Sequence, residues 1–270
     1  MTKYLFRLIL CFIFFTNILN ASLNSWWKNR TTTEKFFYVQ IPAYAGTLIY
    51  GYYQWEYGFK DGFEFKKNPK FFDVKTQGMD KFGHAWVAYT YSSFMADYLD
   101  KRGFSKSKSS NLGFLSSVTF MTFIEVMDGF SKYHRFDYKD EIADIIGAST
   151  GAIRYYYPNI GKKLDYRFEY APTWTEGLGT DYNGQKYFIA LKPSGFKSVQ
   201  NTALKYVDLV LGYYGRKKLE ELKATLFSGV SYNAAALVSN KYTPSNIFNY
   251  YQLPHTSLVK EFYTKITYSD

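Results

Sequence analysis

An acid, a base and a histidine stand within five residues of one another where an apolar segment begins, in the stretch DKFGHAW. On a helix, Asp80 and His84 are four positions apart and Lys81 and His84 are three apart, so the three side chains share one end of one face. An imidazole beside a carboxylate can act as an acid–base group or as a metal ligand. The stretch therefore marks a candidate site, provided that other segments bring partners to it.

Two later segments carry acids at helical spacing in places that are locally unfavourable. Glu125 and Asp128 are three positions apart near the C-terminal end of their segment, where the helix dipole disfavours negative charge. Asp140 and Asp144 are four apart, and like charges at that spacing repel. We therefore expect groups outside each helix to compensate the acids, and the ammonium and imidazole groups of DKFGHAW are the candidates.

Four apolar segments with helix-compatible composition would position these groups. They are residues 36–55, 80–99, 111–130 and 140–157. In an antiparallel bundle the start of the second segment, the end of the third and the start of the fourth lie at the same end. Gly147 and Gly151 allow the fourth helix to pack closely. The sequence thus predicts one polar cluster, formed by Asp80, Lys81, His84, Glu125, Asp128, Asp140 and Asp144.

From residue 164 onward the pattern changes to partial period-two alternation, rich in Tyr, Phe and Val and punctuated by Gly and Pro. The predicted fold class is α+β: a four-helix unit, residues 22–163, followed by a β-rich C-terminal region, residues 164–270. The first helical segment is uncharged enough to span a membrane, whereas Asp97 and Arg154 in later segments are expensive in lipid. The helical unit is accordingly expected to be membrane-embedded or membrane-apposed.

The N-terminus has the pattern of a secretory signal peptide, residues 1–21. Lys3 and Arg7 precede a short apolar run, and Ala21 supplies a small residue at the cleavage point. Cys11, the single cysteine, lies inside that run without the flanking residues of a lipoprotein signal, so the mature chain would contain no disulfide and no thiolate ligand. We expect an exported protein, periplasmic or membrane-associated, in a bacterial envelope.

The formal net charge is +10, with 33 Lys and Arg against 23 Asp and Glu, and the basic residues are clustered. For an exported chain, a membrane lipid or lipopolysaccharide is the expected partner of such clusters, rather than nucleic acid. A solvated surface with no partner is the alternative explanation.

The stretches DKFGHAW, FIEVMDGFS and DEIADIIGAS resemble the bacterial family called domain of unknown function 2279, described as predicted periplasmic lipoproteins. Their skeleton, D-K-x-x-H, then E, then D-x-x-x-[ND]-x-x-G, is also similar to VanZ-like membrane proteins. DYNGQKYF, LVLGYYG and YYQLPHTSL resemble the long members of the first family. Asp144 stands where Asn is usual, which adds a negative charge. The resemblance implies an envelope location and carries no established activity or cofactor.

Three interpretations of the cluster stay open. It can be a buried ion-pair network that fixes helix packing. It can be a metal or acid–base site in which His84, Glu125 and Asp140 offer one nitrogen and two oxygens, which suits zinc or manganese. It can also organise a bound lipid. No GxSxG, Walker or GxGxxG motif names a nucleophile or cofactor.

The first of the resulting function hypotheses is an exported, membrane-associated protein whose cluster is a structural or ligand-organising site. The alternative is a metal- or acid–base-dependent hydrolase or transferase acting on envelope lipid or glycan headgroups, with His84 as the base and a carboxylate that orients it.

Overall fold

The computed structural model describes residues 30–58, 62–73, 75–131, 133–174, 179–218, 221–238, 243–244 and 246–264. The predicted signal peptide lies outside the described residues. The chain divides into two compact units, residues 1–45 and 46–270, and the helix α3 (Thr32–Gln54) crosses their boundary. A capping box starts α3: the Thr31 N–H donates to Glu34 Oε2 at 2.7 Å, and the Glu34 N–H donates to Thr31 Oγ1 at 3.2 Å.

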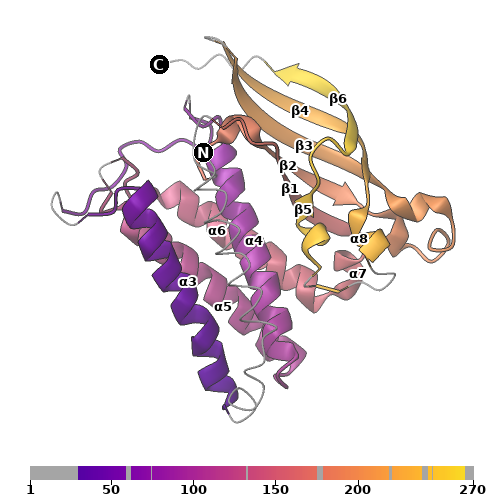
Figure 1. Cartoon of the computed structure of the whole chain (residues 1–270), viewed down its shortest axis with the longest axis horizontal. Helices are drawn as coiled ribbons and strands as arrows, with labels where there is room; N and C mark the ends of the chain where they lie inside the picture. The colour runs from indigo at the N-terminus through magenta and orange to yellow at the C-terminus, as the bar shows by residue number, and fades with distance from the viewer. Residues whose placement is uncertain are drawn as a thin grey trace. The chain divides into compact units, whose positions relative to one another are not determined.

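Three long helices of the second unit, drawn in magenta and pink in Figure 1, correspond to the last three predicted helical segments. They are α4 (Met79–Asp100), α5 (Lys106–Asp128) and α6 (Tyr138–Tyr156). Side-chain caps fix two of the starts, because Ser105 Oγ accepts from the Lys108 N–H and Asp137 Oδ1 accepts from the Lys139 N–H. The short helix α7 (Pro158–Gly161) follows α6.

Glycines bring these helices unusually close together. A Cβ atom at Gly147 would overlap the carbonyl group of Ala85, and one at Gly151 would overlap the carbonyl oxygen of Tyr89. The backbones of α4 and α6 therefore touch along the face that carries the polar groups. The expectation of close packing drawn from Gly147 and Gly151 is confirmed.

The C-terminal region is a six-stranded sheet with the order β5-β1-β2-β3-β4-β6, so the β-rich prediction is confirmed. All neighbours are antiparallel except β1 and β5. The strands are β1 (Leu164–Tyr170), β2 (Gln185–Leu191), β3 (Val207–Lys218), β4 (Glu221–Tyr232), β5 (Tyr251–Gln252) and β6 (Ser257–Thr264). Short helices lie between them: η1 (Tyr182–Gly184), η2 (Pro193–Gly195), η3 (Ala203–Tyr206), α8 (Ala234–Val238) and η4 (Ile247–Asn249).

The sheet curls until strands from its two sides meet. Ser257 Oγ of β6 donates to Glu169 Oε2 of β1 at 3.3 Å, although three strands separate β6 from β1 in the order. Flat strands spaced about 4.8 Å apart would hold these residues far beyond hydrogen-bond distance. Gly212 lies inside the curve, where the Cβ atom of Phe188 and the ring of Phe227 occupy the space that a Cβ on this residue would fill. The concave face therefore has its own aromatic core.

The convex face of the same sheet packs against α4 (Figure 1). The ring of Phe82 lies 5.0 Å from that of Tyr213, and the ring of Trp86 lies 4.9 Å from that of Phe168. The Trp86 Nε1–H also donates to the carbonyl of Tyr250 at 3.0 Å. These contacts join α4, which carries the predicted site, to the sheet.

Among the described helices, none combines the length and the apolar character that a bilayer crossing requires. The membrane-embedded alternative of the predicted fold is therefore not supported. The physical reason lies in the helix interiors, where serines and charged groups are buried between helices along their length. Examples are Ser92, Ser117, Lys81 and Asp144.

Candidate functional site

The ammonium group of Lys81 joins the starts of α4 and α6. Its Nζ lies 2.7 Å from Asp137 Oδ2, 2.7 Å from Asp140 Oδ1 and 3.2 Å from Asp80 Oδ2. Lys81, Asp137 and Asp140 are all buried. Lys66, from the preceding loop, approaches Asp137 Oδ2 at 3.1 Å. The repulsion expected among the acids of α6 is thus offset by a lysine from another helix.

The imidazole of His84 occupies the next turn of α4, between α5 and α6. Its Nδ1 lies 3.2 Å from both carboxylate oxygens of Asp144 and 3.5 Å from Glu125 Oε1. The other oxygen of Glu125, Oε2, accepts a hydrogen bond from the Asp137 N–H at 3.1 Å. Glu125 and Asp144 are buried, whereas the side chain of His84 is 16% exposed.

The structure brings together all seven residues of the predicted cluster, and their role as a site stays a prediction. It also adds residues that sequence reasoning missed. Asp137 caps α6 three positions before Asp140, a spacing that helix-start rules could have identified. Tyr182, more than 100 positions from Asp80, donates its hydroxyl to Asp80 Oδ1 at 2.9 Å, and no local pattern announces that contact.

Burial and charge pull the pKa values of the cluster apart. Burial raises the pKa of Glu125 well above its ordinary value and raises the pKa of Asp140 and of Asp128 to about 7. Burial opposes the charge on His84, but the carboxylates of Asp140, Asp144 and Glu125 outweigh it and raise the pKa of the imidazole well above 6.5. Several groups therefore share protons near neutral pH.

A different balance holds for the carboxyl group at the rim. Burial would raise the pKa of Asp80, but the charges of His84 and Lys81 prevail and lower it to about 2. Asp80 is therefore a permanent carboxylate beside the partly exposed imidazole.

The oxygens and the imidazole could hold a metal ion. Among the described residues, two overlapping sets have ligand atoms within 4.8 Å of one another: Asp80, His84 and Asp140, and His84, Glu125 and Asp144. Glu125 Oε1 and Asp128 Oδ1 are buried; among the described residues His84 Nδ1 lies 3.5 Å from the first, and the hydroxyl of Tyr57 is the neutral partner of the Asp128 carboxyl group. A nitrogen with several carboxylate oxygens is the donor set that suits zinc or manganese.

A second buried charge network, which the sequence analysis did not identify, joins α6 to the sheet. Asp165 of β1 contacts three cations: Arg154 Nη2 and Lys192 Nζ lie 2.7 Å from its Oδ1, and Arg167 Nη2 lies 3.0 Å from its Oδ2. Arg167 also reaches Asp208 Oδ2 of β3 at 2.7 Å. All five side chains are buried.

Residues 71–156, which hold α4, α5 and α6, match the family model described as predicted periplasmic lipoprotein, domain of unknown function 2279. The match confirms the resemblance to this family and agrees with the predicted export and periplasmic or membrane-associated location; the VanZ-like similarity is not shown. No curated protein and no solved structure matches the chain. All seven residues of the predicted cluster lie within the matched segment, on α4, α5 and α6.

Proposed function

We propose that this chain is an exported, membrane-associated envelope protein whose polar cluster is a ligand-organising site for a divalent cation. The observation that carries the proposal is the charge balance around His84. Among the described residues, six carboxyl groups face two ammonium groups and one imidazole. The six are Asp80, Glu125, Asp128, Asp137, Asp140 and Asp144.

A divalent cation would supply the missing positive charge at low cost. His84, Glu125 and Asp144 offer one nitrogen and carboxylate oxygens from three different helices. Protons held by the carboxyl groups of raised pKa would be released as the metal binds, so affinity should fall in acid. Metal binding would also tie the three helices together and stabilise the folded chain.

The test is metal analysis of the purified full-length protein, combined with thermal unfolding after removal and re-addition of ZnCl₂ or MnCl₂. At a metal concentration about 100 times the Kd, binding should stabilise the fold by about 2.7 kcal/mol. His84→Ala and Glu125→Gln should abolish this stabilisation. Asp97→Asn, a change to a buried acid on the same helix four turns away, is the matched control and should retain it.

A distinct set of results would contradict the proposal. If the wild-type chain contains no bound metal and neither salt shifts its unfolding temperature, the cluster is a structural network only. In that case Asp140→Asn would lower stability without changing any metal response, because Lys81 would lose a carboxylate partner.

A second candidate function, a hydrolase or transferase of envelope lipid or glycan headgroups, is favoured by the exposure of His84. Solvent reaches the imidazole of His84 and the carboxylate of Asp80 beside it. The buried carboxyl groups of Glu125 and Asp144 orient the imidazole. If the protein is such an enzyme, the His84→Gln variant should form no product from an envelope lipid or glycan, while its unfolding temperature stays unchanged. A metal-binding protein without this activity would show no product release in any variant.

Membrane association is supported by apolar side chains on the convex face of the sheet beyond α4. Ile189 pairs with Leu211, and Leu209 pairs with Val230, which places these four side chains on one face. Leu211 is 61% exposed and Ile189 is 54% exposed. Co-sedimentation with phosphatidylglycerol vesicles tests this part, and the double variant Leu209→Ser/Leu211→Ser should sediment less.

A further inference from the structure

The loop before α4 combines exposed aromatic rings with exposed lysines. Four of its phenylalanines have exposed fractions from 38% to 66%. They are Phe63, Phe65, Phe71 and Phe72. Lys67 and Lys70 lie between them in the sequence and are exposed as well. Exposed apolar side chains that gather in one segment are typical of a surface that contacts another molecule. We call residues 62–73 the Phe–Lys loop.

The backbone of the Phe–Lys loop is fixed to the segment between α5 and α6. The Lys66 N–H donates to the carbonyl of Phe136 at 2.8 Å, and the Phe136 N–H donates to the carbonyl of Glu64 at 3.0 Å. The ring of Phe65 lies 5.1 Å from that of Phe63 and 5.3 Å from that of Phe136. The rings are thus exposed on an ordered backbone, so a partner would not have to order the loop first.

The acids of this surface have partners within the protein. Glu64 Oε2 lies 2.7 Å from Arg135 Nε, and Asp73 Oδ1 accepts from the Thr76 N–H at 2.7 Å. Among the described residues, four lysines in or beside the loop have no ion-pair partner: Lys67, Lys70, Lys75 and Lys139. The surface therefore presents positive charge next to apolar rings.

From this combination we propose that the Phe–Lys loop docks on the surface of an anionic phospholipid bilayer. The inference rests on the membrane association proposed above and adds a second contact, which selects negatively charged lipid. Lysine ammonium groups near a membrane are attracted to anionic headgroups. Aromatic rings beside them suit the boundary between the headgroups and the acyl chains. The convex face of the sheet, by contrast, offers lipid the aliphatic side chains of Leu209 and Leu211.

Docking through this loop would hold one particular end of the helices nearest to the headgroups, the end that carries the polar cluster. Lys66 Nζ of the loop lies 3.1 Å from Asp137 Oδ2, and Lys139 in the first turn of α6 lies 5.0 Å over the ring of Phe71. The other end of α4 is about 33 Å away, because the helix has 22 residues. An enzyme acting on lipid headgroups would need this orientation.

Co-sedimentation of the full-length protein with phosphatidylcholine vesicles, with and without phosphatidylglycerol, tests the proposal. The wild type should bind the vesicles that contain phosphatidylglycerol about tenfold more tightly or better, and added salt should weaken that binding. Lys67→Ala/Lys70→Ala should bind these vesicles about tenfold more weakly or worse, and pure phosphatidylcholine as the wild type does. Phe65→Ser should weaken binding to both kinds of vesicle.

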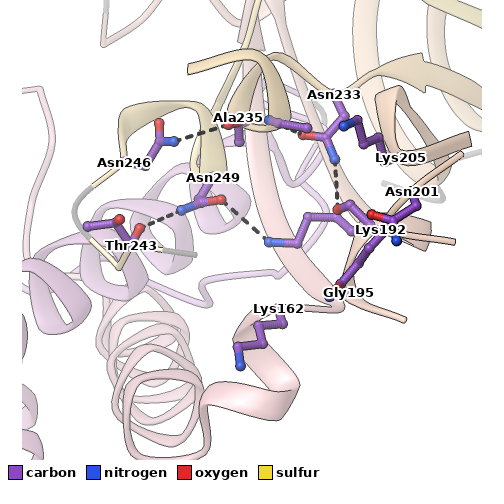
Figure 2. A pocket seen from close by; sticks show the side chains of 13 residues that line it. Lys162, Lys192, Gly195, Asn201, Lys205, Asn233, Ala235, Thr243, Asn246 and Asn249 are labelled. Carbon is purple, nitrogen blue, oxygen red and sulfur yellow. Dashed lines mark hydrogen bonds between the residues drawn. The ribbon is translucent and has the colours of Figure 1, made fainter. Parts of the chain in front are cut away.

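Two other pairs of lysines provide matched controls, since each removes the same charge elsewhere. Lys106→Ala/Lys108→Ala changes the first turn of α5. Lys162→Ala/Lys205→Ala changes the wall of a pocket of about 490 Å³ beside α7, in which Figure 2 shows both side chains. Both control variants should bind the vesicles as the wild type does.

The inference is overturned if Lys67→Ala/Lys70→Ala binds as tightly as the wild type, or if a control pair loses as much affinity as this pair. Sedimentation that still depends on Leu209 and Leu211 would then leave the proposed membrane association intact. A wild type that sediments with neither kind of vesicle would overturn both proposals. Adding EDTA to every sample keeps the result independent of any metal bound at His84.

Discussion

At the scale of single residues, Lys81 is the cation on which the helix starts depend. It is buried and contacts Asp137 and Asp140 at 2.7 Å each. Replacing it by Met removes the charge but keeps the length of the side chain, so both carboxylates would remain buried without their main partner. We expect Lys81→Met to lower the free energy of unfolding by about 3–5 kcal/mol, measured by urea denaturation.

The pair of Lys101 with Asp97, in which the lysine is exposed, provides the control for that experiment. Lys101 is 55% exposed, and its ion pair with Asp97 spans one helical turn. Because solvent screens such a pair, Lys101→Met should change stability by about 0.5 kcal/mol or less. The double variant Lys81→Met/Asp140→Asn should be less destabilised than Lys81→Met. Equal losses for Lys81→Met and Lys101→Met would show that the buried contacts carry little stability.

The second network makes stability depend on pH in two opposite ways. Burial raises the pKa of Asp208 to about 6, so the stability this group contributes is complete below its unfolded pKa of about 3.9 and is lost as pH rises through 6. Burial lowers the pKa of Lys192 to about 8. Between about pH 8 and the unfolded pKa of about 10.4, the lysine holds its proton in the unfolded chain but not in the folded one, so stability rises with pH.

Urea denaturation across this range measures both limbs. We expect Asp208→Asn to flatten the fall between about pH 4 and 6, and Lys192→Met to flatten the rise above about pH 8. A wild-type profile that is level through both windows would contradict the assignment.

At the scale of elements, Gly147 decides how α4 and α6 meet. Its missing Cβ leaves room for the backbone of Ala85. Ala is the better helix former, yet we expect Gly147→Ala to destabilise the protein by about 1–3 kcal/mol, because the helices must move apart. Gly46, in α3, has no heavy atom within 4 Å of where its Cβ would be, so Gly46→Ala should stabilise the chain by about 0.5–1 kcal/mol. Thermal unfolding of both variants gives the comparison.

The helical elements and the meeting of their polar ends could be predicted from the sequence because local rules govern them. Spacing at three and four positions places Lys81 and His84 on one face, and antiparallel packing of short-linked helices places Glu125 and Asp140 opposite. Because the acids stand in unfavourable helical positions, their charges had to be offset by Lys81 and His84 from another helix. The membrane-embedded alternative arose from the apolar residues of these same segments, whose buried polar positions only the tertiary structure reveals.

The second network could not be predicted in the same way. Asp165 and Arg167 alternate with aromatic residues in β1, which is the pattern of a strand with one charged face. That pattern normally indicates a solvated face. Here the sheet curls over it, and the partners come from α6, from the residue after β2 and from β3, at separations that no local rule covers. The sharing of the Asp165 carboxylate by three cations becomes visible only when these segments are assembled.

At the scale of the whole molecule, the ion pair between Arg154 of α6 and Asp165 of β1 makes the helices and the sheet depend on each other. Arg154 also donates to the hydroxyl of Tyr250 at 2.8 Å, next to β5. The sequence predicted a boundary at residue 163, between these partners. Since the contacts across that boundary are buried and charged, neither side can lose them without leaving an unpaired charge in its interior.

We therefore expect residues 46–270 to unfold in one cooperative transition, with equal calorimetric and van't Hoff enthalpies. A chain that ends at residue 163 should lack a cooperative transition, because Arg154 would lose the carboxylate of Asp165 and the aromatic face of α4 would be exposed. Arg154→Met should destabilise the full chain. The double variant Arg154→Met/Asp165→Asn should remain less stable than the wild type, because Asp165 also neutralises Arg167 and Lys192. Two separate calorimetric transitions would instead establish the boundary at residue 163 as a domain boundary.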